Sequence, residues 1–452
     1  MHLRCASCSH VVAIDTTMPW RCPFESGDRH HVLVIEGEDS SARVTPFLDD
    51  PKPFLDDANP FVRYLDRLAF RGYAHSAGLD DEVLVALVRE LDARIETVAG
   101  TGFRVTPLEM APGLGESLDF PGRVWVKDET HNVAGSHKAR HLFSILVHLV
   151  IAERTKRAPW TNESSGPSGT TPTRPPLAIS SCGNAAIAAS TLAAAAEWPI
   201  DVFIPEWAGG VVVDTLDRLG ARVHRCPRRA DDPPGDPTVL RFREAVASGS
   251  IPFSVQGPEN ALCLDGGRTI GWEAAEQLRT HGLTSLEAAY AQVGGGAFAA
   301  SFSRGLGEGG VSAPLVAVQT EGCAPLSRAW ARYRESAKTA NDLAADWTHY
   351  MWPWEHEPVS MADGILDDET YDWVVDLREI ERTGGRVVVA PEPVVRRAAE
   401  LAPRATGIDA SPTGTAGVAG LLHDVETGLF APGVAPEKDS HVLVVLSGVR
   451  RG

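Results

Sequence analysis

The feature that most constrains the fold is an alternation of short apolar segments with helical segments after about residue 104. Strand-like runs such as "RVWVKDE", "LAISSC", "DVFIP", "AAYAQVGGG" and "PLVAVQTEG" each lead into a turn, and segments with helical spacing lie between them. Strands that alternate with helices of roughly 10–15 residues form parallel sheets covered by helices on both faces. The sequence therefore predicts an α/β protein.

Three other segments stand out from this pattern. Residues 40–60 are rich in Pro and Asp and predict a linker or a wrapping arm. Residues 83–95 have helical spacing, with Asp80 as the expected N-cap and Gly100 as the expected stop. The run "TNESSGPSGTTPTRPP" predicts a loop of disordered composition.

Charge and cysteine content limit the partners and the compartment. The net charge of −18 argues against nucleic acid or an anionic membrane as the main partner. There is no apolar run of about 18 or more residues, so no membrane span is expected. The N-terminus lacks the pattern of a secretory signal. The seven cysteines are odd in number and mostly scattered, which indicates reduced thiols in a cytoplasm.

Three cysteines near the N-terminus are spaced like metal ligands. Cys5 and Cys8 form a Cys-x2-Cys pair in "CASC", and Cys22 follows in "WRCP". Tetrahedral zinc takes thiolates from two tight turns of this kind, and His30 or His31 offers a fourth ligand. The sequence thus predicts a zinc-ribbon-like segment, with a ribbon that has lost its metal as the alternative.

The stretch "KDETHNVAGSHKARHL" places one lysine after a glycine turn. A strand ends near Lys127, Gly135 and Ser136 form a turn, and Lys138 opens an apolar helical pattern. Such a lysine projects from the carboxyl edge of a sheet, where open α/β sheets bind ligands. Partial desolvation lowers the pKa of an amine and makes it a nucleophile that forms Schiff bases. Taken alone, the pattern also suits a surface lysine at a helix start.

Three further turns that open a helix offer polar groups. In "SSCGNAAIAAS" and "QVGGGAFAAS", small residues expose backbone N–H groups that suit a carboxylate or a phosphate. In "ASPTGTAGVAGLL", Thr413 offers a neutral hydroxyl. The glycine turn lacks both the dinucleotide fingerprint and the P-loop lysine, so no nucleotide site is predicted. Each turn alone also suits an ordinary helix cap.

These turns occur in the order and spacing of a known family. From about Arg104 to Gly452 the chain resembles the fold-type II pyridoxal-phosphate (PLP) enzymes, the tryptophan-synthase-like group. The resemblance rests on "TPL", on "KDETHNVAGSHKAR" (family pattern K-x-E-x-x-N-P-x-G-S-x-K), and on "SCGNAA", "LDGGRTIGWEAAEQL", "VGGGAFA" and "VQTEGCAP". The cysteine-containing N-terminus with "GGRTIGWE" and "EGCAP" is most similar to the threonine-synthase-like branch.

The resemblance implies roles for particular residues. Lys138 would hold PLP as a Schiff base and act as the base at the substrate Cα, and Thr413 would face the pyridine nitrogen. Asn184 would hydrogen-bond the ring hydroxyl, and His137 would bind the phosphate, with an ordinary turn histidine as the alternative. The phosphate cradle would consist of Gly294, Gly295, Gly296 and Ala297, and the turn for the substrate carboxylate of Ser181, Cys182, Gly183, Asn184 and Ala185.

Four positions depart from the relatives: Ala297 replaces a fourth glycine of the family's glycine loop, His137 stands where many members have Phe, and Cys182 and Ala139 bear on the reaction. In dehydratases and racemases of the family a serine stands before Gly-Asn, on the side of the cofactor opposite the lysine, and here Cys182 takes that place. We hypothesise that Cys182 is a proton donor or acceptor on that side, with simple packing of the turn as the alternative. Ala139 stands where threonine synthases usually have an acidic residue, which puts simple threonine synthase activity in doubt.

The resemblance also implies an activity and an architecture. The expected activity is a PLP-dependent lyase that eliminates a β or γ leaving group from a small amino acid. One alternative is replacement of the leaving group, as in threonine synthase or cysteine or cysteate synthase, and another is a catalytically silent relative that binds an amino acid. A homodimer is expected because family members are usually homodimers.

The implied fold has two three-layer αβα domains with mostly parallel sheets, the cofactor in the cleft between them, and a small cysteine-containing ribbon. The expected limits are 1–35 for the ribbon, 36–89 for the linker and wrapping arm, 90–140 with 251–452 for the large PLP-binding domain, and 141–250 for the small substrate domain.

Overall fold

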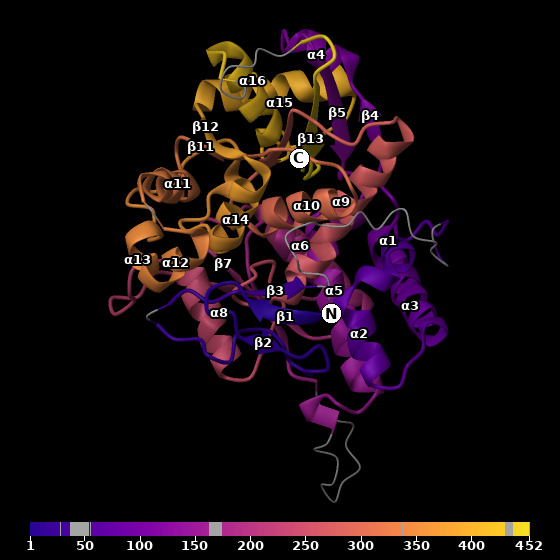
Figure 1. Cartoon of the computed structure of the whole chain (residues 1–452). Helices are drawn as coiled ribbons and strands as arrows, with labels where there is room; N and C mark the ends of the chain where they lie inside the picture. The colour runs from indigo at the N-terminus through magenta and orange to yellow at the C-terminus, as the bar shows by residue number, and fades with distance from the viewer. Residues whose placement is uncertain are drawn as a thin grey trace, which may run out of the picture.

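The computed structural model describes residues 1–27, 29–36, 54, 56–161, 174–336, 338–429 and 437–451. The strands of this part of the chain form a three-stranded, a four-stranded and a six-stranded sheet (Figure 1). The expected α/β architecture with mostly parallel strands is confirmed. Most of the Pro/Asp-rich segment at residues 40–60 and of the loop at residues 161–176 lies outside the described residues.

The six-stranded sheet has the order β12-β11-β10-β13-β5-β4. Its strands are Leu108–Met110 (β4), Arg123–Asp128 (β5), Ala288–Gln292 (β10), Leu315–Thr320 (β11), Arg386–Ala390 (β12) and His441–Leu446 (β13). All neighbours are parallel except β4 and β5. Along β13, Val442 and Val444 enter one core and Leu443 and Val445 the other. Both faces are therefore apolar, as a sheet buried on both sides requires.

Helices cover the two faces of this sheet. Figure 1 shows α15 (Glu392–Thr406) and α16 (Ala416–Thr427) on one side and α9 (Leu262–Thr280) and α10 (Ala297–Glu308) on the other. Helices α9 and α10 touch through backbone: a Cβ on Gly271 would lie 2.3 Å from the carbonyl oxygen of Phe302, and one on Gly305 2.3 Å from that of Arg268. Glycines at both positions thus permit this close packing.

The four-stranded sheet has the order β8-β7-β6-β9 and is wholly parallel. Its strands are Leu177–Ser180 (β6), Ile200–Ile204 (β7), Arg222–Arg225 (β8) and Ile251–Pro252 (β9), and the helices of this region are Lys138–Arg154 (α5), Asn184–Ala195 (α6), Gly210–Arg218 (α7) and Pro237–Ala247 (α8). Leu177 and Ile179 enter the main core, whereas Ala178 packs with Phe203 and with Phe242 of α8 on the opposite face.

The N-terminal part forms a small antiparallel sheet followed by three helices. The sheet contains His2–Cys5 (β1), Val11–Val12 (β2) and Leu33–Glu36 (β3), and the helices are Pro60–Arg63 (α1), Ala69–Ser76 (α2) and Asp81–Ala99 (α3). Asp80 accepts the Val83 N–H at 2.9 Å, and Gly100 has a φ of 77°. Both expected caps of α3 are therefore present.

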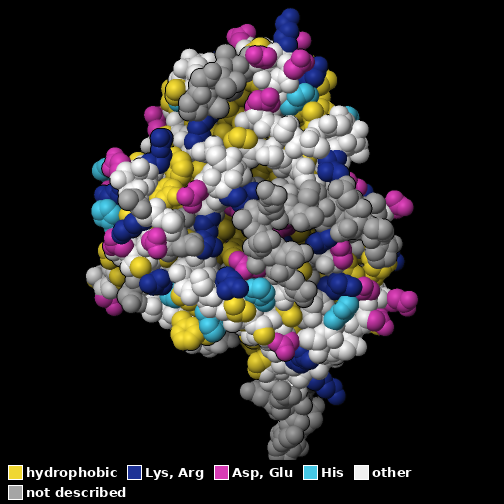
Figure 2. All heavy atoms as spheres, viewed as in Figure 1, with side chains coloured by type: hydrophobic (Ala, Val, Ile, Leu, Met, Phe, Trp, Pro, Cys, Tyr) yellow, Lys and Arg dark blue, Asp and Glu magenta, His cyan; other side chains and the backbone are white. Residues whose placement is uncertain are grey.

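The remaining elements connect these layers. They are the helices Pro112–Ser117 (α4), Pro325–Glu335 (α11), Ala340–Leu343 (α12), Trp347–Tyr350 (α13) and Trp373–Thr383 (α14), and the 3-10 turns Leu65–Arg67, Val133–Gly135, Pro159–Thr161, Ala344–Asp346 and Asp363–Ile365. Among the described residues, no helix is both long and apolar enough to cross a membrane. Figure 2 shows acidic and basic side chains interspersed on the viewed face.

Candidate active site

Lys138 is the first residue of α5, and the turn before it has unusual backbone geometry. Ala134 and Gly135 have φ values of 56° and 70°, and a Cβ on Gly135 would lie 2.4 Å from Cγ1 of Val449. The turn therefore requires glycine at this position. Lys138 is half-buried, and burial lowers the pKa of its amine against the opposing effect of the negative charge of Asp367. A lowered pKa increases the fraction of nucleophilic, neutral amine.

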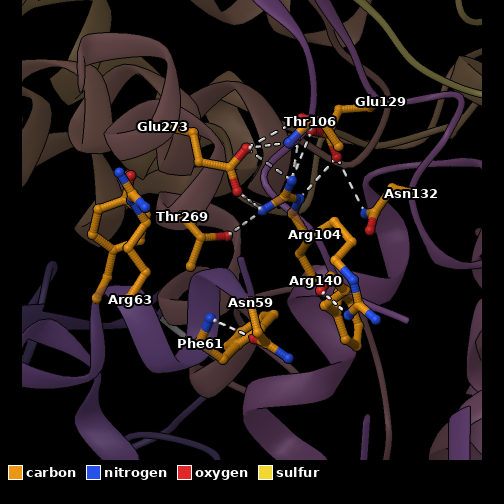
Figure 3. Close-up of polar contacts among 12 residues, drawn as sticks. Asn59, Phe61, Arg63, Arg104, Thr106, Glu129, Asn132, Arg140, Thr269 and Glu273 are labelled. Carbon is orange, nitrogen blue, oxygen red and sulfur yellow. Dashed lines mark hydrogen bonds and ion pairs between the residues drawn. The ribbon is translucent and has the colours of Figure 1, made fainter. Parts of the chain in front are cut away.

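A buried network of charged groups holds this turn in place (Figure 3). Arg140 donates to Glu129 from Nε at 2.8 Å and to Glu273 from Nη1 at 2.6 Å, and Lys127 donates to Glu273 at 2.7 Å. Asn132 donates from Nδ2 to Glu129 at 3.2 Å and to the carbonyl of Ser136 at 3.1 Å. The network joins β5, α9 and α5 with two cations and two anions. Through Asn132 the network fixes the turn at Ser136, two residues before Lys138.

His137 lies between this turn and the first turn of α10. Its ring stacks on Phe298 with centroids 4.2 Å apart. Its backbone N–H donates to Ser447 Oγ at 3.1 Å, and the same hydroxyl lies 2.5 Å from Nδ1. Burial lowers the pKa of His137 well below its usual value, so the ring is neutral. When Ser447 donates its proton to Nδ1, the ring hydrogen lies on Nε2, a buried atom without a hydrogen-bond partner in the described part of the chain.

The glycine turn follows β10 and opens α10. Gly296 has a φ of 101°, and Ala297 begins a helix of 12 residues. The first N–H groups of a helix have no intrahelical partner, and the helix dipole favours an anion there. His137 approaches this helix start through its contact with Phe298. The start of α10 and the His137 ring together form a polar cradle suited to a phosphate.

Three aspartates from residues 367–376 lie against the glycine turn. A Cβ on Gly294 would lie 2.3 Å from Oδ2 of Asp367, and one on Gly296 2.2 Å from Oδ2 of Asp376. Asp372 donates its N–H to the Gly295 carbonyl at 2.8 Å. Burial raises the pKa of Asp367 to about 6 and of Asp372 to about 7, and it raises the pKa of Asp376 well above its usual value. At neutral pH Asp376 is therefore protonated and Asp372 partly so, whereas Asp367 stays mostly ionised and its charge acts on Lys138.

The turn after β6 faces the site from the four-stranded sheet. It contains Ser181, Cys182 and Gly183, all half-buried, and leads into the first residues of α6, Asn184 and the buried Ala185. Gly183 donates its N–H to Ser181 Oγ at 3.3 Å. Burial, with the nearby charges of three aspartates, raises the pKa of the Cys182 thiol to about 12. The thiol therefore stays protonated at neutral pH.

Asn184 is oriented by the end of the described chain. Arg451 donates from Nη2 to Asn184 Oδ1 at 3.1 Å and to the Ala134 carbonyl at 2.6 Å. Because a guanidinium only donates hydrogen bonds, this contact assigns the amide oxygen to the Arg451 side. A Cβ on Gly448 would lie 2.8 Å from Nδ2 of Asn184. The amide nitrogen is thus the group of Asn184 available as a donor.

Thr413 lies in the turn before α16. Its Oγ1 accepts the Gly364 N–H at 2.9 Å and donates to Asp363 at 3.2 Å. The next residue, Gly414, packs so closely that a Cβ on it would lie 2.6 Å from the carbonyl oxygen of Ser447. Ser447 contacts His137, and the neighbouring Gly448 contacts Asn184.

The structure therefore brings the four turns identified in the sequence together. Three of them follow β5, β6 and β10, and the Thr413 turn, between α15 and α16, packs against the residues that follow β13. The candidate metal ligands do not belong to this site. The structure gathers Cys5, Cys8 and Cys22 with His31 in a separate cluster near the N-terminal sheet.

Several residues at the site escaped the sequence analysis. They are Asp363, Asp367, Asp372, Ser447 and Arg451. The acidic run "DGILDDETYD" and the polar end "LSGVRR" after an apolar strand were visible signals. Neither run has a spacing that indicates a position in space, because the contacts depend on the way the sheet assembles.

Comparison with known proteins identifies the family. A family model described as "Pyridoxal-phosphate dependent enzyme" matches residues 100–448. Maize serine racemase is similar in structure, with 17% identity, 81% of this chain and 93% of that chain covered, and a TM-score of 0.55. Diaminopropionate ammonia lyase from Escherichia coli has 17% identity, 81% and 88% coverage, and a TM-score of 0.56.

The processed form of threonine deaminase isoform 2 from Solanum lycopersicum has 16% identity, 83% and 86% coverage, and a TM-score of 0.56. No curated protein matches the sequence. At these identities the solved structures show a shared fold alone, whereas the family model spans most of the chain. The chain belongs to the family of pyridoxal-phosphate-dependent enzymes of fold type II.

Proposed function

We propose that this PLP-dependent enzyme is a lyase that eliminates a β or γ leaving group from a small amino acid. The observation that carries the proposal is the half-buried Lys138 with a lowered pKa beside His137, whose buried Nε2 is open to an external acceptor. The threonine deaminase and the diaminopropionate ammonia lyase among the similar structures support elimination chemistry.

The residues present fit PLP. The cradle at Gly294, Gly295, Gly296 and Ala297 offers helix N–H groups to the phosphate, and His137 offers Nε2. The Lys138 amine would bind the cofactor aldehyde. Nδ2 of Asn184 would donate to the ring hydroxyl, because Arg451 holds the amide oxygen.

The chain's own groups have distinct tasks in the proposed reaction. When bound, PLP withdraws electrons from the substrate Cα. Lys138 takes the proton from Cα, and the turn Ser181–Ala185 with the start of α6 holds the substrate carboxylate. Thr413 would face the ring nitrogen, and its proton, which is donated to Asp363 at 3.2 Å in this structure, would turn to that nitrogen. A neutral hydroxyl does not force protonation of the ring, which favours loss of a leaving group over transamination. Cys182, with its protonated thiol, donates a proton on the side opposite Lys138.

Related activities remain as alternatives. A second nucleophile in place of water would give a replacement reaction of the threonine-synthase-like or cysteine- or cysteate-synthase kind. Racemisation would use the same Cα proton transfer, and a serine racemase is among the similar structures. A silent amino-acid binder is the third alternative, against which the intact Lys138 speaks.

We also propose a cytoplasmic homodimer. All seven cysteines are free, which supports a reducing compartment.

Lys138→Ala is the first test. Borohydride reduction of the wild type, followed by mass spectrometry, is expected to find the cofactor on the peptide that carries Lys138, and the variant is expected to lose both the adduct and the activity. Lys338→Ala removes an exposed lysine and is the matched control. No adduct in the wild type would favour the silent binder.

A substrate panel separates the alternatives. Serine, threonine, diaminopropionate, O-phosphoserine and O-phosphohomoserine are assayed for 2-oxo acid and ammonia. Both products are expected from at least one of them. Conversion of the amino acid into its enantiomer without formation of a 2-oxo acid would instead establish a racemase. Formation of a new amino acid only in the presence of an added thiol would establish a replacement enzyme.

A further inference from the structure

A cluster of three thiols and one imidazole lies apart from the candidate active site. One ligand atom from each of Cys5, Cys8, Cys22 and His31 lies within 4.8 Å of all the others. Cys5 Sγ is 3.4 Å from His31 Nδ1, and Cys8 Sγ is 3.6 Å from Cys22 Sγ. Cys5, Cys22 and His31 are buried, and Cys8 is half-buried.

These spacings are close to the edges of a zinc tetrahedron. With Zn–S bonds of about 2.3 Å and Zn–N bonds of about 2.0–2.1 Å, two sulfurs lie about 3.8 Å apart and a sulfur and a nitrogen about 3.6 Å apart. A disulfide would instead require an S–S distance of about 2.05 Å, and Cys8 and Cys22 are free. The arrangement therefore matches metal ligation and not a disulfide.

The backbone around the cluster explains how the ligands meet. Ser9 adopts a left-handed φ of 61°, and Cys5 donates its N–H to the His10 carbonyl at 2.8 Å, which closes a tight turn around Cys8. The antiparallel pairing of β1 with β3 places Cys5 opposite Leu33, and this register brings His31 beside Cys5. The Ser7 N–H donates to Cys5 Sγ at 3.5 Å, as expected for a sulfur with thiolate character.

We propose that Cys5, Cys8, Cys22 and His31 bind one Zn²⁺ ion in a closed, structural site. Three soft thiolates and an imidazole in a tetrahedron favour zinc, and four protein ligands leave no open position for catalysis. The strands β1, β2 and β3 have only four, two and four residues. Strands this short bury little surface of their own, and a structural metal is a usual means of holding so small a unit.

The ribbon is also in contact with the candidate active site. Arg378 of α14 donates to the Ala6 carbonyl, and the ring of His30 lies 5.8 Å from that of Trp373. Trp373 follows Asp372, whose N–H binds the glycine turn at Gly295. The zinc site therefore holds the N-terminal ribbon against the helix whose first turn lies on the glycine turn.

Metal content is the direct test. The full-length protein, purified without chelator, is expected to contain one zinc per chain by plasma mass spectrometry. Replacement by Co²⁺ is expected to give visible bands of tetrahedral, thiolate-bound cobalt. Wild-type protein that takes up neither ion after reduction and incubation with the metal alone would overturn the proposal.

Single substitutions identify the ligands. Cys8→Ser and His31→Gln are each expected to lower bound zinc at least tenfold after dialysis against a weak chelator. His30→Gln and Cys226→Ser, a buried cysteine outside the cluster, are expected to retain it. Loss of zinc in H30Q with retention in H31Q would overturn the assignment of the fourth ligand, and retention in C8S would overturn the site.

A further readout concerns the ribbon itself. Zinc removal from the holoenzyme is expected to expose residues 1–36 to limited proteolysis, and added zinc is expected to restore protection. Unchanged protection would contradict the structural role. These measurements do not depend on PLP chemistry, so the zinc proposal and the proposed function can fail independently.

Discussion

At the scale of single residues, Lys127 and Lys138 show how hydrogen bonding separates a structural amine from a reactive one. Burial lowers the pKa of both Lys127 and Lys138. The Lys127 amine donates to the Thr106 carbonyl at 2.7 Å, to Glu273 at 2.7 Å and to Gln277 at 3.0 Å, so all three of its protons are engaged. Lys138 makes no such side-chain hydrogen bond among the described residues. Its amine is therefore available for chemistry.

Cys182→Ser tests the proposed proton donor on the side opposite Lys138. A hydroxyl is a weaker acid than a thiol, and general acid catalysis contributes a factor of about 10²–10⁴. We therefore expect kcat with the best substrate of the panel to fall at least tenfold while the cofactor stays bound. Cys226→Ser is the control. If C182S largely keeps its activity, the thiol only packs the turn.

At the scale of elements, the sequence predicted the strands and helices whose turns form the site but not the contacts between them. The alternation in residues 104–320 and both caps of α3 are confirmed, because they depend on local periodicity and local hydrogen bonds. The position of Asp372 against Gly295 was not predictable, because α14 is placed by packing against α10 and against the N-terminal ribbon. The same holds for Ser447 and Arg451, which reach the site only after β13 enters the sheet.

The buried network that joins β5, α5 and α9 predicts a large effect of one substitution. Arg140→Met leaves Glu129 and Glu273 buried with less positive charge, and breaking a buried ion pair in this way costs about 3–5 kcal/mol. The free energy of unfolding, measured in urea, is expected to fall by that amount. Arg123→Met is the control. Arg123 is exposed and forms an ion pair with Asp439 at 3.8 Å, and exposed ion pairs contribute about 0–1 kcal/mol. Equal losses in both variants would show that the network adds little stability.

At the scale of the whole molecule, the raised pKa values of the aspartates around the glycine turn predict that stability depends on pH. Burial raises the pKa of Asp372 from 3.8 to about 7, so between these values the folded state binds more protons than the unfolded state. Stability contributed by this group is therefore fully present below pH 4 and is lost as the pH rises through 7. The loss is up to about 4 kcal/mol.

Asp372→Asn removes this titration and keeps an oxygen that accepts the Gly257 N–H, which Asp372 binds at 3.0 Å. The variant is expected to match the wild type in urea unfolding near pH 4 and to exceed it in stability near pH 8. Asp231→Asn changes an exposed carboxylate and is expected to follow the wild type at every pH. Parallel pH profiles for wild type and D372N would contradict the buried, protonated state of Asp372.

The position of β13 in the six-stranded sheet has a consequence for biosynthesis. Residues 441–446 leave the ribosome after the other five strands of the six-stranded sheet, yet they lie in its interior between β10 and β5, which do not pair with each other. Until they emerge, the nascent chain holds β4–β5 and β10–β11–β12 as two fragments with open inner edges, and such edges are prone to aggregation. Completion of the sheet, and with it delivery of Ser447 and Arg451 to the site, must wait until residues 441–451 have been translated. A nascent chain stalled at residue 440 should therefore depend on chaperones much more than one released with β13 in place.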